Sequence, residues 1–163
     1  MLKIHINIKT PFEFKNSFEL KTPFEFDKDW LKDTAKKVFD LLRKAGDYEF
    51  EINVVSPEQI RKLNKDFRNK DKSTTILSFV SSEIKDKFIE APSKYRYLGE
   101  IFVCPEEIEK QAEEIKISTK KQVTRILVHG ILHLLEYGHD TNERTREMEE
   151  IENKVVNLPY CKN

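Results

Sequence analysis

The chain contains 163 residues, of which 38% are hydrophobic and 36% charged, and its formal net charge is zero. This length fits one globular domain over residues 1–163 with its own core, and zero net charge gives no whole-molecule attraction to nucleic acid. No apolar run approaches the roughly 20 residues that cross a bilayer, and the N-terminus lacks a signal-peptide core, so we expect a soluble, cytoplasmic protein. Cys104 and Cys161 are too few for a disulfide framework or a zinc ribbon.

The first third of the chain predicts two strands with a helix between them. Apolar and polar residues alternate over residues 2–8 and again over 48–55, as in strands with one buried face. An apolar stripe at helical spacing predicts a helix from about residue 29 to about Ala45, ended by Gly46. Residues 9–26 hold a Phe-rich repeat, in which Lys-Thr-Pro-Phe-Glu-Phe occurs twice. Its rings either cover a sheet edge or core, which is the commoner role, or form a stacking surface for bases.

The rest of the chain predicts two more strands and several helices. Ser56, Pro57 and Gln59 form the start of a short helix with a capping box. A strand follows near residues 76–79, then a polar connector over 81–95 and a central strand over 98–103. Helices are expected at about 105–115, 119–137 and 142–156. This order predicts an α+β domain with one mixed sheet of about four strands packed with helices.

Three of the four histidines fall in one short stretch, with the spacing His-x3-His-x5-His. Residues four apart lie on the same face of a helix, so His129 and His133 can point at one ion. Gly138 is a natural helix stop, after which His139 can fold back as a third ligand. A lone histidine on such a helix is usually a packed core residue, but three at this spacing favour a metal site. Three imidazoles and an open fourth position are typical of catalytic zinc.

Glu136 lies seven residues after His129, within about 20° of the same helix face if the helix continues to Tyr137. It is either a solvent-facing residue near the helix end, the commoner case, or a proton acceptor beside the metal site.

Basic residues gather in two places near this candidate site. Six of them lie between Arg61 and Lys72, and a second group lies between Lys116 and Arg125, whereas the last helix is mainly acidic. Such runs usually form solvated surface, but here they modestly favour a substrate that carries phosphate.

Residue 130 separates this site from the common zinc proteases, which place a glutamate after the first histidine as general base. Gly130 occupies that position. The stretch more closely resembles the signature of the YbeY family of bacterial endoribonucleases, His-Gly-x-Leu-His-Leu-x-Gly-Tyr-Asp-His. The matching residues are His129, Gly130, Leu132, His133, Leu134, Tyr137 and His139. Glu136 replaces a glycine of the signature, and Gly138 replaces an aspartate.

Two further segments support the resemblance. Residues 63–79 are similar to the family pattern Leu-Asn-x-x-Tyr-Arg-Gly…Thr-Asp-Val-Leu-Ser-Phe, with Asn69 in place of glycine and Thr75 in place of aspartate. Arg68 matches the arginine that the family places at its active site. Its planar donors suit phosphate oxygens, and its alternative role is a surface ion pair with a nearby acid. Residues 98–101 resemble the family segment Leu-Gly-Asp-Ile.

The resemblance spans residues 48–156 and implies a zincin-like fold. It also implies a metal-dependent, single-strand-specific endoribonuclease acting in ribosomal RNA maturation. His129, His133 and His139 would hold one Zn²⁺, and Arg68 would offset charge on the phosphate. RNA is then the expected partner, with the small ribosomal subunit as a candidate, and no membrane is involved.

Two other functions stay open. The first is a zinc metallopeptidase that lacks the usual glutamate base and docks a peptide along an extended edge near Gly99. The second is a non-enzymatic, ribosome-associated zinc protein whose metal only holds the fold.

Overall fold

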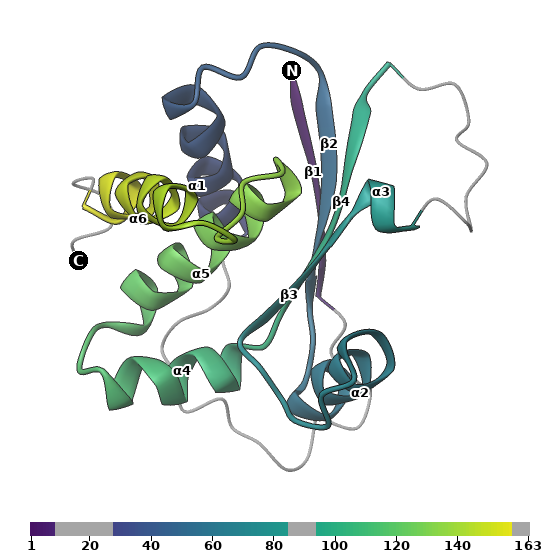
Figure 1. The fold of residues 1–163 in the computed structure, drawn as a ribbon, viewed down its shortest axis with the longest axis vertical. Coiled ribbons are helices and arrows are strands. Elements are labelled where there is room, and N and C mark those ends of the chain that lie inside the picture. The colour runs from purple at the N-terminus through teal and green to yellow at the C-terminus, as the bar shows by residue number, and fades with distance from the viewer. Residues whose placement is uncertain (9–27, 85–93, 158–163) are drawn as a thin grey trace.

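The computed structural model describes residues 1–8, 28–84 and 94–157 (Figure 1). Along the chain the elements are β1 Leu2–Ile8, α1 Lys28–Leu41, β2 Tyr48–Val54, α2 Pro57–Arg68, β3 Ile76–Val80, α3 Ser81–Ile84, β4 Arg96–Val103, α4 Pro105–Glu114, α5 Thr119–Leu134 and α6 Asn142–Val156. The predicted order is confirmed, except that the short α3 begins the range expected to be a connector. The Phe-rich repeat lies outside the described residues. None of the described helices is long and apolar enough to cross a bilayer.

The four strands form one mixed sheet in the order β1-β2-β4-β3. The pairs β1–β2 and β2–β4 are parallel, whereas β3 runs antiparallel to β4. The predicted α+β class and four-stranded mixed sheet are therefore confirmed. The prediction of an extended edge near Gly99 is wrong, because β4 lies between β2 and β3 in the sheet. Gly99 has φ +132°, and a side chain there would overlap the carbonyl oxygen of Phe79 on β3.

Helices cover the sheet unequally. In Figure 1, α1, α4, α5 and α6 lie on one side of the sheet and α2 on the other. The larger core joins β2 and β4 to the first group of helices, with α5 at its centre. A smaller apolar cluster lies under α2; it comprises Val55, Ile60, Leu77 and Cys104, with Leu63, Phe79 and Phe102 packed against it.

The helix α5 packs closely against the sheet at Gly130. A Cβ built there would lie 2.6 Å from Cδ1 of Ile76 and 3.2 Å from Cδ1 of Ile101. The glycine thus lets the backbone beside His129 pack directly over β3 and β4.

The ends of two other helices show how local sequence sets them. The capping box of α2 forms as predicted: the Ser56 side chain accepts from the Gln59 amide, and the Gln59 side chain accepts from the Ser56 amide. The helix α1 was predicted to reach about Ala45 but ends at Leu41. Arg43 takes the left-handed conformation with φ 49°, and its amide donates to the Asp40 carbonyl while Lys44 donates to Phe39. This pair of bonds is a Schellman motif, which closes the helix before Gly46.

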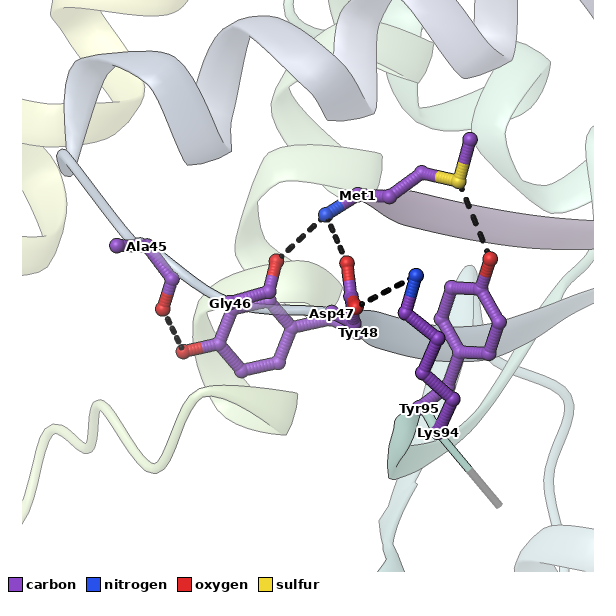
Figure 2. Close-up of polar contacts among 7 residues, drawn as sticks. All are labelled: Met1, Ala45, Gly46, Asp47, Tyr48, Lys94 and Tyr95. Carbon is purple, nitrogen blue, oxygen red and sulfur yellow. Dashed lines mark hydrogen bonds and ion pairs between the residues drawn. The ribbon is translucent and has the colours of Figure 1, made fainter.

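The start of β1 is fastened to the loop that precedes β2 (Figure 2). The Met1 amino group donates to the Gly46 carbonyl at 2.8 Å and also pairs with Asp47. Lys94 reaches the same Asp47 carboxylate at 3.3 Å, so both cations hold the pKa of Asp47 below its usual range. The hydroxyl of Tyr95 donates to Sδ of Met1 at 3.1 Å.

Candidate metal centre

The structure brings together the three histidines singled out in the sequence. His129 and His133 lie one turn apart on α5, and His139 lies in the connection between α5 and α6. One nitrogen of each imidazole lies within 4.8 Å of the other two, and Nε2 of His129 is 2.9 Å from Nε2 of His133. His129 and His133 are half-buried, whereas His139 is exposed, so the cluster is open to solvent on one side.

The geometry of this cluster fits a divalent ion. Zinc binds imidazole nitrogen at about 2.0–2.1 Å in a tetrahedral arrangement, which places ligand nitrogens about 3.3 Å apart. The three donor atoms, all within 4.8 Å of one another, reach that spacing by small side-chain rotations. Three neutral imidazoles suit zinc and several other transition metals, and they leave a coordination position for a reactant.

Glu152 supports the cluster and was missed by the sequence reasoning. Its Oε1 lies 2.8 Å from Nδ1 of His129, and its side chain is 14% exposed. A carboxylate on Nδ1 keeps the proton there, which would leave the lone pair of Nε2 free to bind an ion. Glu152 belongs to α6, 23 residues away from His129. The acidic sequence of that helix indicated only solvated surface, and no local spacing signals this contact.

His133 remains neutral over a wide pH range. Burial, together with the neighbouring His129 and His139, lowers its pKa from 6.5 to about 4, although the Tyr137 backbone and Glu152 act in the opposite direction. A neutral imidazole is the form that binds metal. His133 therefore offers a free lone pair at neutral pH without losing a proton first.

The turn after α5 differs from the prediction. The helix was expected to reach Tyr137 with Gly138 as its stop, but it ends at Leu134. Glu136 takes the left-handed conformation, with φ 65°. Its amide donates to the His133 carbonyl at 2.9 Å, and the Tyr137 amide donates to the Leu132 carbonyl at 2.9 Å, which again forms a Schellman motif.

This turn changes the expectation for Glu136. The helical geometry that would bring its side chain to the histidine face requires a helix through Tyr137, and that condition is not met. The side chain is exposed, and Glu136 stands at the position where the family signature has glycine. A catalytic role for Glu136 thus stays a prediction that rests on the chemistry of a carboxylate alone.

The connection that carries His139 is fastened to α6. Arg144 donates to the Glu136 carbonyl at 2.8 Å and to Oδ1 of Asp140 at 2.6 Å. The Thr145 hydroxyl lies 2.9 Å from the Thr141 carbonyl oxygen and 3.3 Å from that of His139, and its proton can be donated to either. The first turn of α6 therefore positions the third histidine, and α6 also supplies Glu152.

Arg68 lies at the edge of the sheet, at the end of α2. Its Nη2 donates to the Ser78 carbonyl at 3.0 Å and pairs with Glu83 at 3.3 Å, and its guanidinium lies 5.3 Å from the centre of the Phe79 ring. The ion pair considered as its alternative role is thus present. Both partners are exposed, at 41% and 48%, so the pair is weak and exchangeable.

The edge strand β3 connects Arg68 to the histidine helix. Arg68 bonds to the backbone of Ser78, and Ile76, two residues earlier, lies under Gly130. At about 3.3 Å per residue, the two points are about 7 Å apart along the strand.

Two other features take no part in the cluster. Burial raises the pKa of Cys104 to about 12, so this thiol is neither a nucleophile nor a metal ligand at neutral pH. A groove of about 620 Å³ lies between β1 and α1, lined by residues such as Lys3, Lys36 and Tyr48. None of the predicted site residues lines it, and we assign the chemistry to the histidine cluster on the basis of its ligand set.

The fold and the cluster define an α+β protein with a candidate three-histidine metal centre over a mixed sheet. The family model for the endoribonuclease YbeY matches residues 14–158, and the chain belongs to this family. An endoribonuclease YbeY of a Sulfurihydrogenibium species is 38% identical over 82% of this chain and 84% of the relative. The Aquifex aeolicus relative of the same name is 35% identical over 77% and 81% of the two chains. A Thermotoga maritima protein solved in solution is 26% identical, with a TM-score of 0.54 over 96% of this chain and 87% of that one.

The substitution Glu136→Gly should stabilise the protein by about 1 kcal/mol, because glycine adopts the left-handed conformation without the penalty that other residues incur. Urea unfolding of the metal-free protein measures this. Glu147→Gly, at an exposed position in the middle of α6, should instead lose about 1 kcal/mol. A Glu136→Gly variant less stable than the wild type would contradict the assignment of the turn.

The substitution Glu152→Gln should weaken metal binding by about 10- to 100-fold, because His129 loses the carboxylate that orients its ring and raises its basicity. Competition with a chromogenic chelator measures the affinity. Glu150→Gln removes the same charge from an exposed position on α6 and should leave the affinity within about twofold. Equal affinities of the two variants would show that Glu152 has no specific role.

The metal-free protein should lose stability as the pH falls from 6.5 towards 4. In this range the unfolded chain binds a proton at His133, whereas the folded chain holds this imidazole neutral, so acid favours the unfolded state. Urea unfolding at several pH values measures the effect, and subtracting the profile of His133→Asn removes the contribution of the carboxylates. Parallel profiles for the two proteins would contradict the lowered pKa.

Proposed function

We propose that the protein is a metal-dependent, single-strand-specific endoribonuclease that acts in ribosomal RNA maturation in the cytoplasm. The observation that carries this proposal is the convergence of His129, His133 and His139 on one point that is open to solvent. Membership of a family whose relatives are named endoribonuclease supports RNA as the substrate. Small-subunit ribosomal RNA is the proposed natural target.

The three histidines would hold one divalent ion, with zinc as the proposed metal. A bound ion of this kind supplies Lewis acidity toward a phosphoryl oxygen and lowers the pKa of water. Two features of the chain favour binding of such an ion. Glu152 fixes the protonated nitrogen of His129, and burial keeps His133 neutral.

Arg68 is the proposed phosphate ligand. Its guanidinium is held over the Phe79 ring and by the Ser78 carbonyl, which leaves its orientation defined while the exposed Glu83 partner can be exchanged. A phosphate diester offers the same paired oxygens as a carboxylate. Arg68 would thus pass from Glu83 to the scissile phosphate and offset charge that develops in the transition state.

The peptidase alternative is weakened by the surroundings of Gly130. A residue with a side chain at this position would meet Ile76 and Ile101, so the position is packed against the sheet and offers no place for a general base. The interior location of β4 also removes the proposed peptide edge at Gly99. A purely structural metal is disfavoured by the exposure of His139 and by only three candidate ligands in the described part of the chain.

Cleavage of labelled single-stranded and duplex RNA tests the proposal. The wild type should cleave the single strand in preference, lose activity with a chelator and regain it with zinc. His133→Ala should lower the rate at least about 100-fold through loss of metal, and Arg68→Ala by about 100- to 1000-fold with metal content unchanged. Lys154→Ala, which removes an exposed charge from α6, should behave as the wild type.

Other results in the same experiment separate the alternatives. Peptide cleavage without RNA cleavage would favour the peptidase, and loss of folding on chelation without any turnover would favour a structural metal. Glu136→Gln examines the remaining carboxylate: a loss of about 100-fold or more at unchanged metal content would support its role as a proton acceptor, whereas unchanged activity would exclude it.

A further inference from the structure

Phe67 is an exposed aromatic residue in the last turn of α2. It continues the inward-facing stripe of Ile60, Leu63 and Asn64 at helical spacing. The residue is 58% exposed, whereas Ile60 is fully buried. An isolated exposed phenylalanine needs no explanation, but Phe67 is next to other aromatic rings and lies in a segment rich in basic residues.

The ring of Phe67 rests on a row of other aromatic rings. It meets the edge strand through Phe79 at a centroid distance of 5.2 Å and an interplanar angle of 67°. Phe79 in turn meets Phe102 at 5.8 Å and 81°. These edge-to-face contacts are the favoured geometry of aromatic pairs. They hold Phe67 from one side, while more than half of its surface faces solvent.

The segment that carries Phe67, residues 61–72, holds six basic residues against two carboxylates, Asp66 and Asp71. Arg68 follows it directly and stacks over the same Phe79 ring. Lys62, Lys70 and Lys72 are exposed and have no ion-pair partner within the described residues, whereas Arg61 and Lys65 share Asp71. An exposed ring among cations, beside a phosphate-binding arginine, is the combination that proteins use to bind single-stranded nucleic acid.

We propose that Phe67 is a stacking platform for a nucleobase that flanks the scissile phosphate of a single-stranded RNA. This inference rests on the proposed function and adds a substrate subsite to it. An RNA whose phosphate binds Arg68 would place a neighbouring base at Phe67, the preceding residue. The Ser78 carbonyl that holds Arg68 lies about 7 Å along β3 from Ile76, the residue under Gly130. The contacts of Phe67 with Phe79 and of Arg68 with Ser78 place the C-terminal end of α2 beside β3, and α2 lies on the side of the sheet opposite α5 (Figure 1). The strand would therefore pass over the β3 edge, from the histidines to Phe67.

Stacking on Phe67 would favour single-stranded RNA over duplex RNA. A base in a duplex is stacked on its neighbours and paired, so it cannot present its face to a protein ring. Stacking on Phe67 depends on the face of the base and not on hydrogen bonds, so it should discriminate little between sequences.

Binding of single-stranded DNA of about 12 nucleotides to the metal-loaded protein tests the platform, because this strand offers bases and phosphates but no 2′-hydroxyl. Phe67→Ala should weaken binding by about 5- to 100-fold, whereas Phe67→Trp should bind as tightly as the wild type or more tightly. Ile115→Ala, another exposed apolar residue, which follows α4, should have no effect. A strand of equal length with abasic sites should bind equally to the wild type and Phe67→Ala, since only the base contact is removed.

Equal binding of Phe67→Ala and wild type to the strand with bases would overturn the platform and leave the ring as a contact for a protein partner. An equal loss on the abasic strand would also overturn it, because the effect would then be structural; thermal unfolding of each variant checks the fold. RNA cleavage by the wild type is measured in parallel. Its absence contradicts the proposed endoribonuclease, whereas cleavage with an unchanged KM in Phe67→Ala contradicts the platform alone.

Discussion

The close packing of α5 on β3 and β4 at Gly130 sets the rest of the site. Because a side chain at this position would meet Ile76 and Ile101, the helix can lie against the sheet only with glycine there. His129 directly precedes Gly130, so its backbone is fixed by the same contact, and His133 follows His129 one turn later on the same helix face. The edge strand under Gly130 also carries the carbonyl that holds Arg68. One helix–sheet contact thus sets the position of two of the three proposed metal ligands, His129 and His133, relative to the proposed phosphate ligand.

The helix α6 positions the parts of the histidine cluster that α5 does not fix. Its first turn holds the connection after α5 through Arg144 and Thr145, and Glu152 reaches back to His129 from about two turns further along. The third histidine is therefore placed by hydrogen bonds to backbone carbonyls and not by regular secondary structure. A ligand held in this way can shift slightly, which allows the three nitrogens to adjust when an ion is bound.

The sequence predicted the order of the elements and the three histidines, because these depend on periodicity and on short spacing. It failed at two helix ends for the same reason. The helices α1 and α5 both close in a Schellman motif with Arg43 and Glu136 in the left-handed position. The prediction instead placed the helix ends at the next glycines, Gly46 and Gly138. Tertiary contacts impose a conformation that the local residues disfavour. Glu152 and the position of Arg68 beside β3 were also not predictable, because both contacts depend on how distant elements pack.

The turn after α5 forms although Glu136 replaces the glycine of the family signature. The signature has glycine where Glu136 stands, and the backbone keeps the left-handed conformation that glycine would adopt freely. The Glu136 carbonyl meanwhile accepts a hydrogen bond from Arg144, which also binds Asp140. These bonds oppose the local strain and hold the chain on its path to His139. The turn therefore retains the geometry that the metal centre needs although the residue best suited to it is absent, and the strain lies at the boundary of the site and not among its ligands.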